Sequence, residues 1–316
     1  MSFDQLMQHA RDIQQKAIML AKADADALSI GSFTGLDRDK HPLQRAKVHQ
    51  RIEESFADVP SIFEPFAEMP DPGAFGGLID PLKQALQSLA LDSERDPISN
   101  VVYPGDAVMG RISASGSFIG EWTGKAAREF KANFVDPFPV MAKSQFVMIA
   151  VLRSALEAER EIWTNARNDI DNAAHQALEA LDRINECGKN EWNLAFTVAA
   201  SVAAIGALPM AGSALTAVTA VGAASQVAAA GTSKMKDSEK LQFSGESPEA
   251  VIQELRVAAD KLATLIDEQE TIIARAMISN QQLVSARMDD MVANRPALTG
   301  MTQSNVASPE YMGYST

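Results

Sequence analysis

The chain has 316 residues, with 28 Lys and Arg against 41 Asp and Glu, which gives a formal net charge of −13. This acidity argues against nucleic acid as a partner, because binding to phosphates needs clustered Lys and Arg side chains. The single cysteine excludes an internal disulfide framework and a cysteine-rich metal site. Aromatic residues make up only 6% of the chain, and alanine is abundant, so the composition favours an all-α protein.

The first predicted element is an amphipathic helix within the first 28 residues. Its apolar positions recur close to helical spacing: Leu6, Ile13, Ala17, Leu20 and Leu28. Charges such as Asp4 are spread through this segment. It therefore lacks the basic start and the continuous apolar run of a cleaved secretion signal. If the protein leaves the cytoplasm, we expect a route that does not use such a signal.

The rest of an N-terminal helical region, residues 1–100, contains short helices and a connection rich in proline and glycine. Helices are predicted over 43–56 and 78–91, and prolines at 60, 65, 70 and 72 prevent one long helix between them. A turn region over 92–104 then leads to a helix over 105–115.

Two long helical runs dominate the second half of the chain. The first covers residues 140–190 and follows a predicted helix break at Pro137 and Pro139. The second covers 247–295, with Ser247 as N-cap and Pro248 at the first helical position. At ~1.5 Å per residue each reaches roughly 70 Å. Their similar lengths predict an elongated antiparallel hairpin or bundle. Residues 296–316 carry one charge and no periodicity, and we expect them to be disordered.

An uncharged segment separates the long runs. Its 42 residues, Trp192–Ser233, contain no Asp, Glu, Lys, Arg or His. The pattern predicts an apolar hairpin over 194–233, with helices at 194–208 and 214–230 and a turn at Pro209. The length of each helix is at or just below the roughly 17–25 residues that a helix needs to cross a bilayer. Three interpretations stay open: a buried core hairpin, reversible membrane insertion and a permanent transmembrane hairpin. The residues predicted to contact membrane or partner are Leu194, Val198, Val202, Ile205, Pro209, Leu215, Val218 and Val221.

A glycine-bounded turn, Gly120–Gly124, lies within the region 101–193 and contains Trp122. The helix that follows places Phe130 and Phe134 one turn apart, and Phe118 extends the aromatic stripe on the other side. We expect Trp122 to pack in the seam between two helices while Gly124 lets the chain reverse. An ordinary interhelical turn is the alternative interpretation.

At Trp122-Thr123-Gly124, followed by Ala126, Ala127 and Phe130, the sequence resembles the Trp-X-Gly superfamily of type VII (ESX) secretion systems. The resemblance covers roughly residues 105–230, and the larger ESX-associated proteins also carry long helices and an Ala/Gly-rich apolar segment after this turn. It implies a helical hairpin, export or display at the cell surface after synthesis in the cytoplasm, and a protein partner. That partner would be a small Trp-X-Gly protein, a secretion chaperone or a second copy.

The family's export signal, Tyr followed four positions later by Asp or Glu, is missing. Tyr103 is followed at that spacing by Ala107. The resemblance therefore implies either that a partner carries the signal or that export does not take this route.

No catalytic or cofactor-binding pattern stands out in the sequence. The run from Gly120 to Lys125 is one residue short of a phosphate-binding loop and lacks the following Ser or Thr. The four histidines are scattered along the sequence. A short acidic stretch with Asp37, Asp39 and His41 is typical of a solvated loop. We therefore expect a protein that is not an enzyme and needs no cofactor or metal. A hypothesis of a different class is an α-helical pore-forming or membrane-perturbing protein whose long arms bracket the apolar hairpin.

Overall fold

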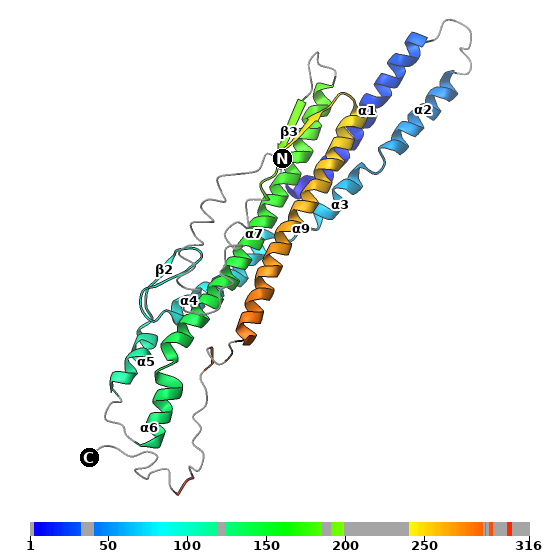
Figure 1. The fold of residues 1–316 in the computed structure, drawn as a ribbon. Coiled ribbons are helices and arrows are strands. Elements are labelled where there is room, and N and C mark those ends of the chain that lie inside the picture. The colour runs from blue at the N-terminus through cyan, green and yellow to red at the C-terminus, as the bar shows by residue number, and fades with distance from the viewer. Residues whose placement is uncertain are drawn as a thin grey trace. The chain divides into compact units, whose positions relative to one another are not determined.

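The computed structural model describes residues 3–32, 41–118, 124–184, 191–198 and 240–286, with 288, 291–292 and 302–304. This part of the chain is mostly helical, which confirms the predicted all-α class, and it also contains two short antiparallel ribbons. The chain divides into two compact units. Two long helices, α7 (Phe138–Arg183) and α9 (Pro248–Ala286), contribute to both units (Figure 1).

The first unit contains residues 1–72, 160–201 and 234–270. Its N-terminal elements are η1 (Phe3–Gln5), α1 (Leu6–Ser32), α2 (His41–Ser55), η2 (Val59–Ile62) and α3 (Glu64–Ala67). Helix α1 contacts α2, η2 and α3. The predicted stripe on α1 is buried from Leu6 to Leu20, whereas Leu28 is exposed. Because these side chains face the core, the spacing of the apolar residues in the sequence predicts this helix correctly.

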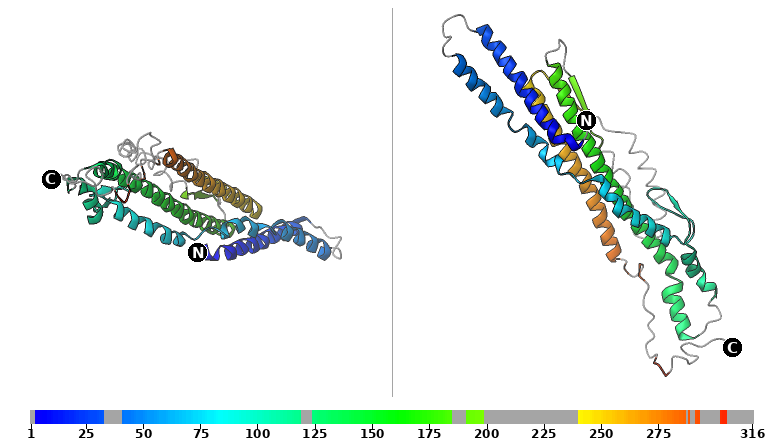
Figure 2. Two further views of the ribbon diagram at one scale, coloured as in Figure 1. Left: turned by 90° about the horizontal axis from the view of Figure 1, so that it is seen from below. Right: turned by 180° about the vertical axis from the view of Figure 1, so that it is seen from behind.

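The later part of α7 and the first part of α9 complete this unit. They lie side by side and run in opposite directions (Figure 1 and Figure 2). Both bury an apolar stripe, formed by Ile162, Ile170 and Leu181 on α7 and by Val251, Leu255 and Leu262 on α9. The predicted start of α9 is confirmed, because Ser247 Oγ accepts a hydrogen bond from the backbone N–H of Ala250 at 3.2 Å.

The second unit contains residues 73–159, 202–233 and 271–316. Its described elements, after η3 (Pro72–Phe75), are α4 (Gly76–Leu89), β1 (Glu94–Arg95), β2 (Val102–Tyr103), α5 (Ala107–Phe118), α6 (Lys125–Phe130), η4 (Lys131–Val135) and the first half of α7. Leu86, Ala90, Tyr103, Phe146 and Ala150 form a buried cluster. Tyr103 and Phe146 meet edge to face, with ring centroids 5.7 Å apart.

A turn at residues 136–137 separates η4 from α7, which confirms the predicted helix break at Pro137. The π-helical turn η4 precedes Pro137, and Pro139 sits in the first turn of α7, where the missing N–H is tolerated. Other predicted boundaries are wrong. The predicted turn region 92–104 contains the β1–β2 ribbon. Helix α9 ends at Ala286, short of residue 295. The predicted tail, apart from 302–304, lies outside the described residues.

Candidate functional site

The base of the uncharged segment is a two-stranded ribbon of β3 (Glu191–Ala195) and β4 (Lys240–Ser244). The strands are antiparallel, with Glu191 opposite Ser244 and Ala195 opposite Lys240. This register brings the two sides of the intervening chain together at residues 195 and 240. The predicted start of a helix at residue 194 is wrong, because Leu194 and Ala195 belong to strand β3.

Side chains alternate between buried and exposed along the first strand and just beyond it. Trp192, Leu194, Phe196 and Val198 are buried, while the residues between them are exposed. Such alternation is typical of a strand with one covered face. The prediction treated this segment as a uniform apolar run and therefore expected a helix. The alternation of large apolar side chains at every second position was the signal that could have revealed the strand.

Two of the residues predicted to contact membrane or partner therefore belong to the protein core. Leu194 and Val198 are fully buried in the first unit. The other six, Val202, Ile205, Pro209, Leu215, Val218 and Val221, lie outside the described residues.

Glu254 of α9 fixes both strands of the ribbon. Its Oε2 accepts a hydrogen bond from the Trp192 indole Nε1–H at 2.8 Å, and its Oε1 accepts one from the Ser244 backbone N–H at 2.9 Å. The Trp192 and Phe243 rings face each other across the ribbon, with centroids 4.4 Å apart. One carboxylate therefore ties β3 and β4 to the second turn of α9.

Asp169 of α7 holds the residues that follow the first strand. Its Oδ2 accepts hydrogen bonds from the backbone N–H groups of Thr197, at 2.8 Å, and Val198, at 3.1 Å. Its Oδ1 accepts one from the Thr197 hydroxyl at 2.9 Å. Asp169 is only 3% exposed. Burial raises the pKa of Asp169, and the three hydrogen bonds act in the opposite direction. Sequence reasoning missed both Asp169 and Glu254, which were indistinguishable from other acidic residues on the long helices.

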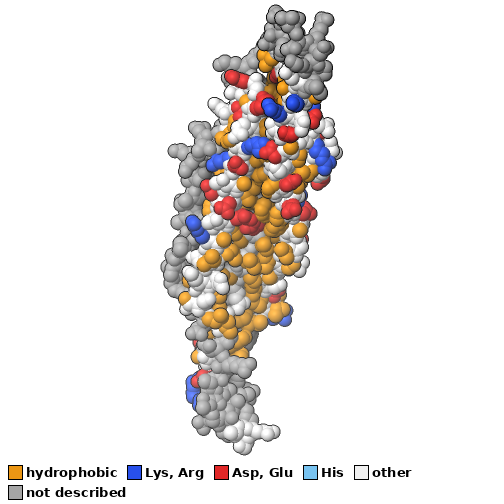
Figure 3. All heavy atoms as spheres, turned by 90° about the vertical axis from the view of Figure 1, so that its right-hand side faces the viewer, with side chains coloured by type: hydrophobic (Ala, Val, Ile, Leu, Met, Phe, Trp, Pro, Cys, Tyr) orange, Lys and Arg blue, Asp and Glu red, His pale blue; other side chains and the backbone are white. Residues whose placement is uncertain are grey.

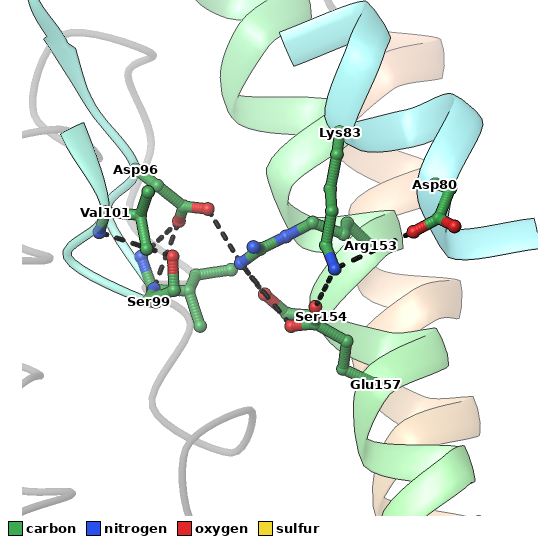
Figure 4. Close-up of polar contacts among 9 residues, drawn as sticks. Asp80, Lys83, Asp96, Ser99, Val101, Arg153, Ser154 and Glu157 are labelled. Carbon is green, nitrogen blue, oxygen red and sulfur yellow. Dashed lines mark hydrogen bonds and ion pairs between the residues drawn. The ribbon is translucent and has the colours of Figure 1, made fainter. Parts of the chain in front are cut away.

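The second unit contains a different buried carboxylate, Asp96, in the turn between β1 and β2. Asp96 is fully buried, and its Oδ2 lies 2.7 Å from Nη2 of Arg153 on α7 (Figure 4). Its Oδ1 accepts hydrogen bonds from the backbone N–H groups of Ile98, at 2.8 Å, and Ser99, at 3.1 Å. Asn100 completes this turn with a positive φ of 60°.

Two further charged groups extend this cluster along α7 and α4. Nη2 of Arg153 lies 3.6 Å from Oε2 of Glu157, and Oε1 of Glu157 lies 3.7 Å from Nζ of Lys83 (Figure 4). Burial raises the pKa of Tyr103, which packs in the adjoining core. The cluster pins the β1–β2 ribbon to α7 and gives it a structural role.

The Trp-X-Gly turn is described only at its end. Trp122 and Thr123 lie outside the described residues, as do the side chain of Phe118 and residues Asp37, Asp39 and Cys187. Gly124 precedes α6 with φ 98° and ψ 177°, a conformation that side chains strongly disfavour. Phe130 and Phe134 stack with centroids 5.2 Å apart, and Phe138 continues the row at 5.7 Å from Phe134. The sequence prediction had missed Phe138.

The described residues contain one candidate membrane-spanning helical run and no candidate metal-binding cluster. One helical run, Lys125–Arg183, is long and apolar enough to cross a membrane by length and composition alone, and 39% of its most apolar window is buried inside the protein. A core helix passes the same test. No group of three or more His, Cys, Asp or Glu side chains in the described parts of the chain could hold a metal ion.

Comparison with known proteins adds no relative: no family model, curated protein or solved structure matches the chain.

Proposed function

We propose that this chain is a non-enzymatic protein associated with a type VII (ESX) secretion system. It is an exported substrate that works through helical contacts with a protein partner, either a small Trp-X-Gly protein, a secretion chaperone or a second copy. The missing tyrosine-based signal assigns the targeting role to that partner. Export places the protein outside the cell or at its surface.

The observation that carries this proposal is the local geometry around the Trp-X-Gly sequence. The glycine of the motif, Gly124, has a positive φ and stands directly before α6. Helix α5, on the other side of the motif, packs against η4, which continues α6. Such an arrangement is what a helix–turn–helix hairpin requires, and a bulky residue at position 124 would oppose it.

Exposed apolar side chains in the second unit support association through helix faces. Leu78 on α4, Val108 on α5 and Ile278 on α9 are each more than half exposed. On the face drawn in Figure 3, hydrophobic side chains reach the surface between charged groups. Apolar surface of this kind is a common feature of protein–protein contacts.

Export is tested in the native host by comparing cells with and without the motor ATPase of the secretion system. We expect the protein in the culture filtrate or cell wall of intact cells and only in the cytosol of ATPase-deficient cells. Trp122→Ala should abolish export, whereas the matched control Trp163→Phe, far along the chain in α7, should not. An identical distribution with and without the ATPase would contradict the proposal.

A second function, membrane perturbation by the uncharged segment, is favoured by the β3–β4 ribbon. Pairing of residues 191–195 with 240–244 gives the intervening chain a single closed base on the helical scaffold. The ribbon is thus the point at which the uncharged segment joins the helical scaffold.

Dye release from vesicles tests this second function. We expect release with the full chain, loss of release with Val218→Asp, and normal release with Val257→Asp, which adds the same charge to an exposed position of α9. Absence of release at every pH and lipid composition would rule out a pore. Unfolding of the Val218→Asp protein would instead assign the segment to the core.

A further inference from the structure

The β1–β2 ribbon has one face against α7 and one exposed face. Glu94 and Tyr103 are paired in its register and both face the helix: Glu94 Oε2 lies 3.7 Å from a lysine Nζ of α7, and Tyr103 packs on Phe146. The other register pair, Arg95 and Val102, is exposed. Because side chains alternate along a strand and paired residues share a face, Arg95 and Val102 lie together on the outer face.

Contacts at the turn and at the base hold the ribbon in place. At the turn, where the buried Asp96 is paired with α7 (Figure 4), the Asp96 N–H donates to the Val101 carbonyl at 2.8 Å, and the Asn100 N–H donates to the Asp96 carbonyl at 3.0 Å. At the base, a Cβ at Gly105 would come within 2.8 Å of the Asp92 Cα, so the two segments pass closely there. A partner that binds this ribbon therefore orders few residues, which favours association.

Three apolar side chains are exposed within one short stretch of the chain. Val101 and Val102 are each 48% exposed, and Val108, in the first turn of α5, is 61% exposed. None of the three belongs to the buried cluster of Tyr103 and Phe146. Burial of apolar surface against a partner is worth roughly 25 cal/mol per Å². These side chains therefore contribute more to an association than to the stability of the single chain.

The exposed charges beside these valines suit a second copy of the same chain. Asp92 and Arg95 are both exposed and have opposite charges. The other two acidic residues of the ribbon, Glu94 and Asp96, already pair with cations of α7. The exposed charges of the ribbon are thus balanced, although the whole chain has a net charge of −13, and this balance limits repulsion between two copies. In a two-fold contact the same surface occurs on both sides, so Arg95 of each copy can meet Asp92 of the other.

We propose that two copies of this chain associate through the exposed side of the β1–β2 ribbon. Val101 and Val102 of the two copies pack across a two-fold axis, and Arg95 of each copy pairs with Asp92 of the other. This inference rests on the proposed function in so far as it selects the second copy among the partners named there, and it uses no residue of the Trp-X-Gly turn. Because each copy contributes one short ribbon, we expect a reversible association with a Kd of roughly 1–100 μM.

Sedimentation velocity of the full chain, at concentrations from about 1 to 300 μM, tests the association. We expect a reversible equilibrium between monomer and dimer. Val102→Asp places a charge at the centre of the contact and should leave only monomer across this range. The matched control is Val48→Asp, which adds the same charge to a position of α2 that is 43% exposed, and we expect it to keep the wild-type equilibrium.

Charge reversal tests the pairing of Arg95 with Asp92. Arg95→Glu and Asp92→Arg each place like charges opposite one another, and we expect each to raise the Kd of the dimer about tenfold or more. The double variant restores opposite charges in the reverse order and should return the Kd to within about threefold of wild type. Because both side chains are exposed, these variants test the contact even if Val102→Asp does not fold.

A monomer at every concentration would overturn the inference, as would a dimer that Val102→Asp leaves intact or a double variant that does not recover affinity. Export is scored separately. If the dimer responds as expected while export is independent of the motor ATPase, the proposed function fails and the contact stands. If export depends on the ATPase while the chain is monomeric, the proposed function stands and the contact fails.

Discussion

Each of the two units buries a carboxylate, but the units compensate the two groups differently. Asp96 in the second unit meets the guanidinium of Arg153 at 2.7 Å. Asp169 in the first unit meets two backbone amides and one hydroxyl. The first carboxylate faces a guanidinium, whereas the second faces neutral hydrogen-bond donors. This contrast separates a buried ion pair from a buried carboxyl held by neutral groups.

The largest expected effect comes from breaking the compensated pair. Arg153→Met leaves the buried Asp96 carboxylate without its cation, so we expect the free energy of unfolding to fall by about 3–5 kcal/mol. Urea denaturation measures this change. The control is Arg183→Met, because Arg183 is exposed and pairs with Glu179 at the surface; we expect it to change stability by less than about 1 kcal/mol. Equal effects of the two substitutions would remove the distinction between the buried pair and a surface pair.

The next effect concerns the backbone at the Trp-X-Gly turn. Gly124→Ala introduces a side chain at φ 98°, and we expect a loss of roughly 1–3 kcal/mol in unfolding free energy. Gly77→Ala is the matched control, because a Cβ at that position of α4 meets nothing within 4 Å. Calorimetry should show a lower melting temperature for the first variant and an unchanged or higher one for the second. A neutral Gly124→Ala would contradict the need for glycine before α6.

A similar loss is expected at the base of the ribbon. Glu254→Gln replaces one acceptor oxygen with a donor NH₂ group, so either the Trp192 indole or the Ser244 amide loses its acceptor. The expected cost is about 1–3 kcal/mol. Circular dichroism during denaturation reports the change, with Glu249→Gln, an exposed residue in the first turn of α9, as control. Retention of full stability by Glu254→Gln would show that the carboxylate does not hold both strands.

The smallest effect is expected at a surface pair with the opposite pH response. The hydrogen bond from Arg256 lowers the pKa of Asp58, so this contact contributes stability above the ordinary value of 3.8 and loses it as pH falls through the lowered value. Both side chains are partly exposed, and Asp58→Asn should cost less than about 1 kcal/mol at pH 7. The difference from wild type should vanish in strong acid. A difference that grows toward low pH would reverse the assignment.

The helices were predictable because their signals are local. The spacing of Leu6, Ile13 and Ala17 predicts α1, and Ser247 with Pro248 predicts the start of α9. The aromatic row at Phe130 and Phe134 was also visible at helical spacing. Each of these features depends on residues within a few turns of one another.

The candidate site was not predictable because its contacts join distant parts of the chain. Trp192 and Glu254 are 62 residues apart, and Asp169 and Val198 are 29 apart. Nothing in the surroundings of Asp169 in the sequence distinguishes it from the solvated acids of the same helix. The strand at 191–195 was obscured by the apolar run that follows it, although its alternation was present.

The titration of the Asp169 carboxyl, followed by its carbon NMR signal in the full chain, tests the difference between the two buried carboxylates most directly. We expect the pKa of Asp169 to lie above the ordinary value of 3.8 and the Thr197 and Val198 amide signals to titrate with the same midpoint. A pKa at or below 3.8, or amide signals that do not follow the carboxyl, would contradict the view that burial dominates over the three hydrogen bonds at Asp169.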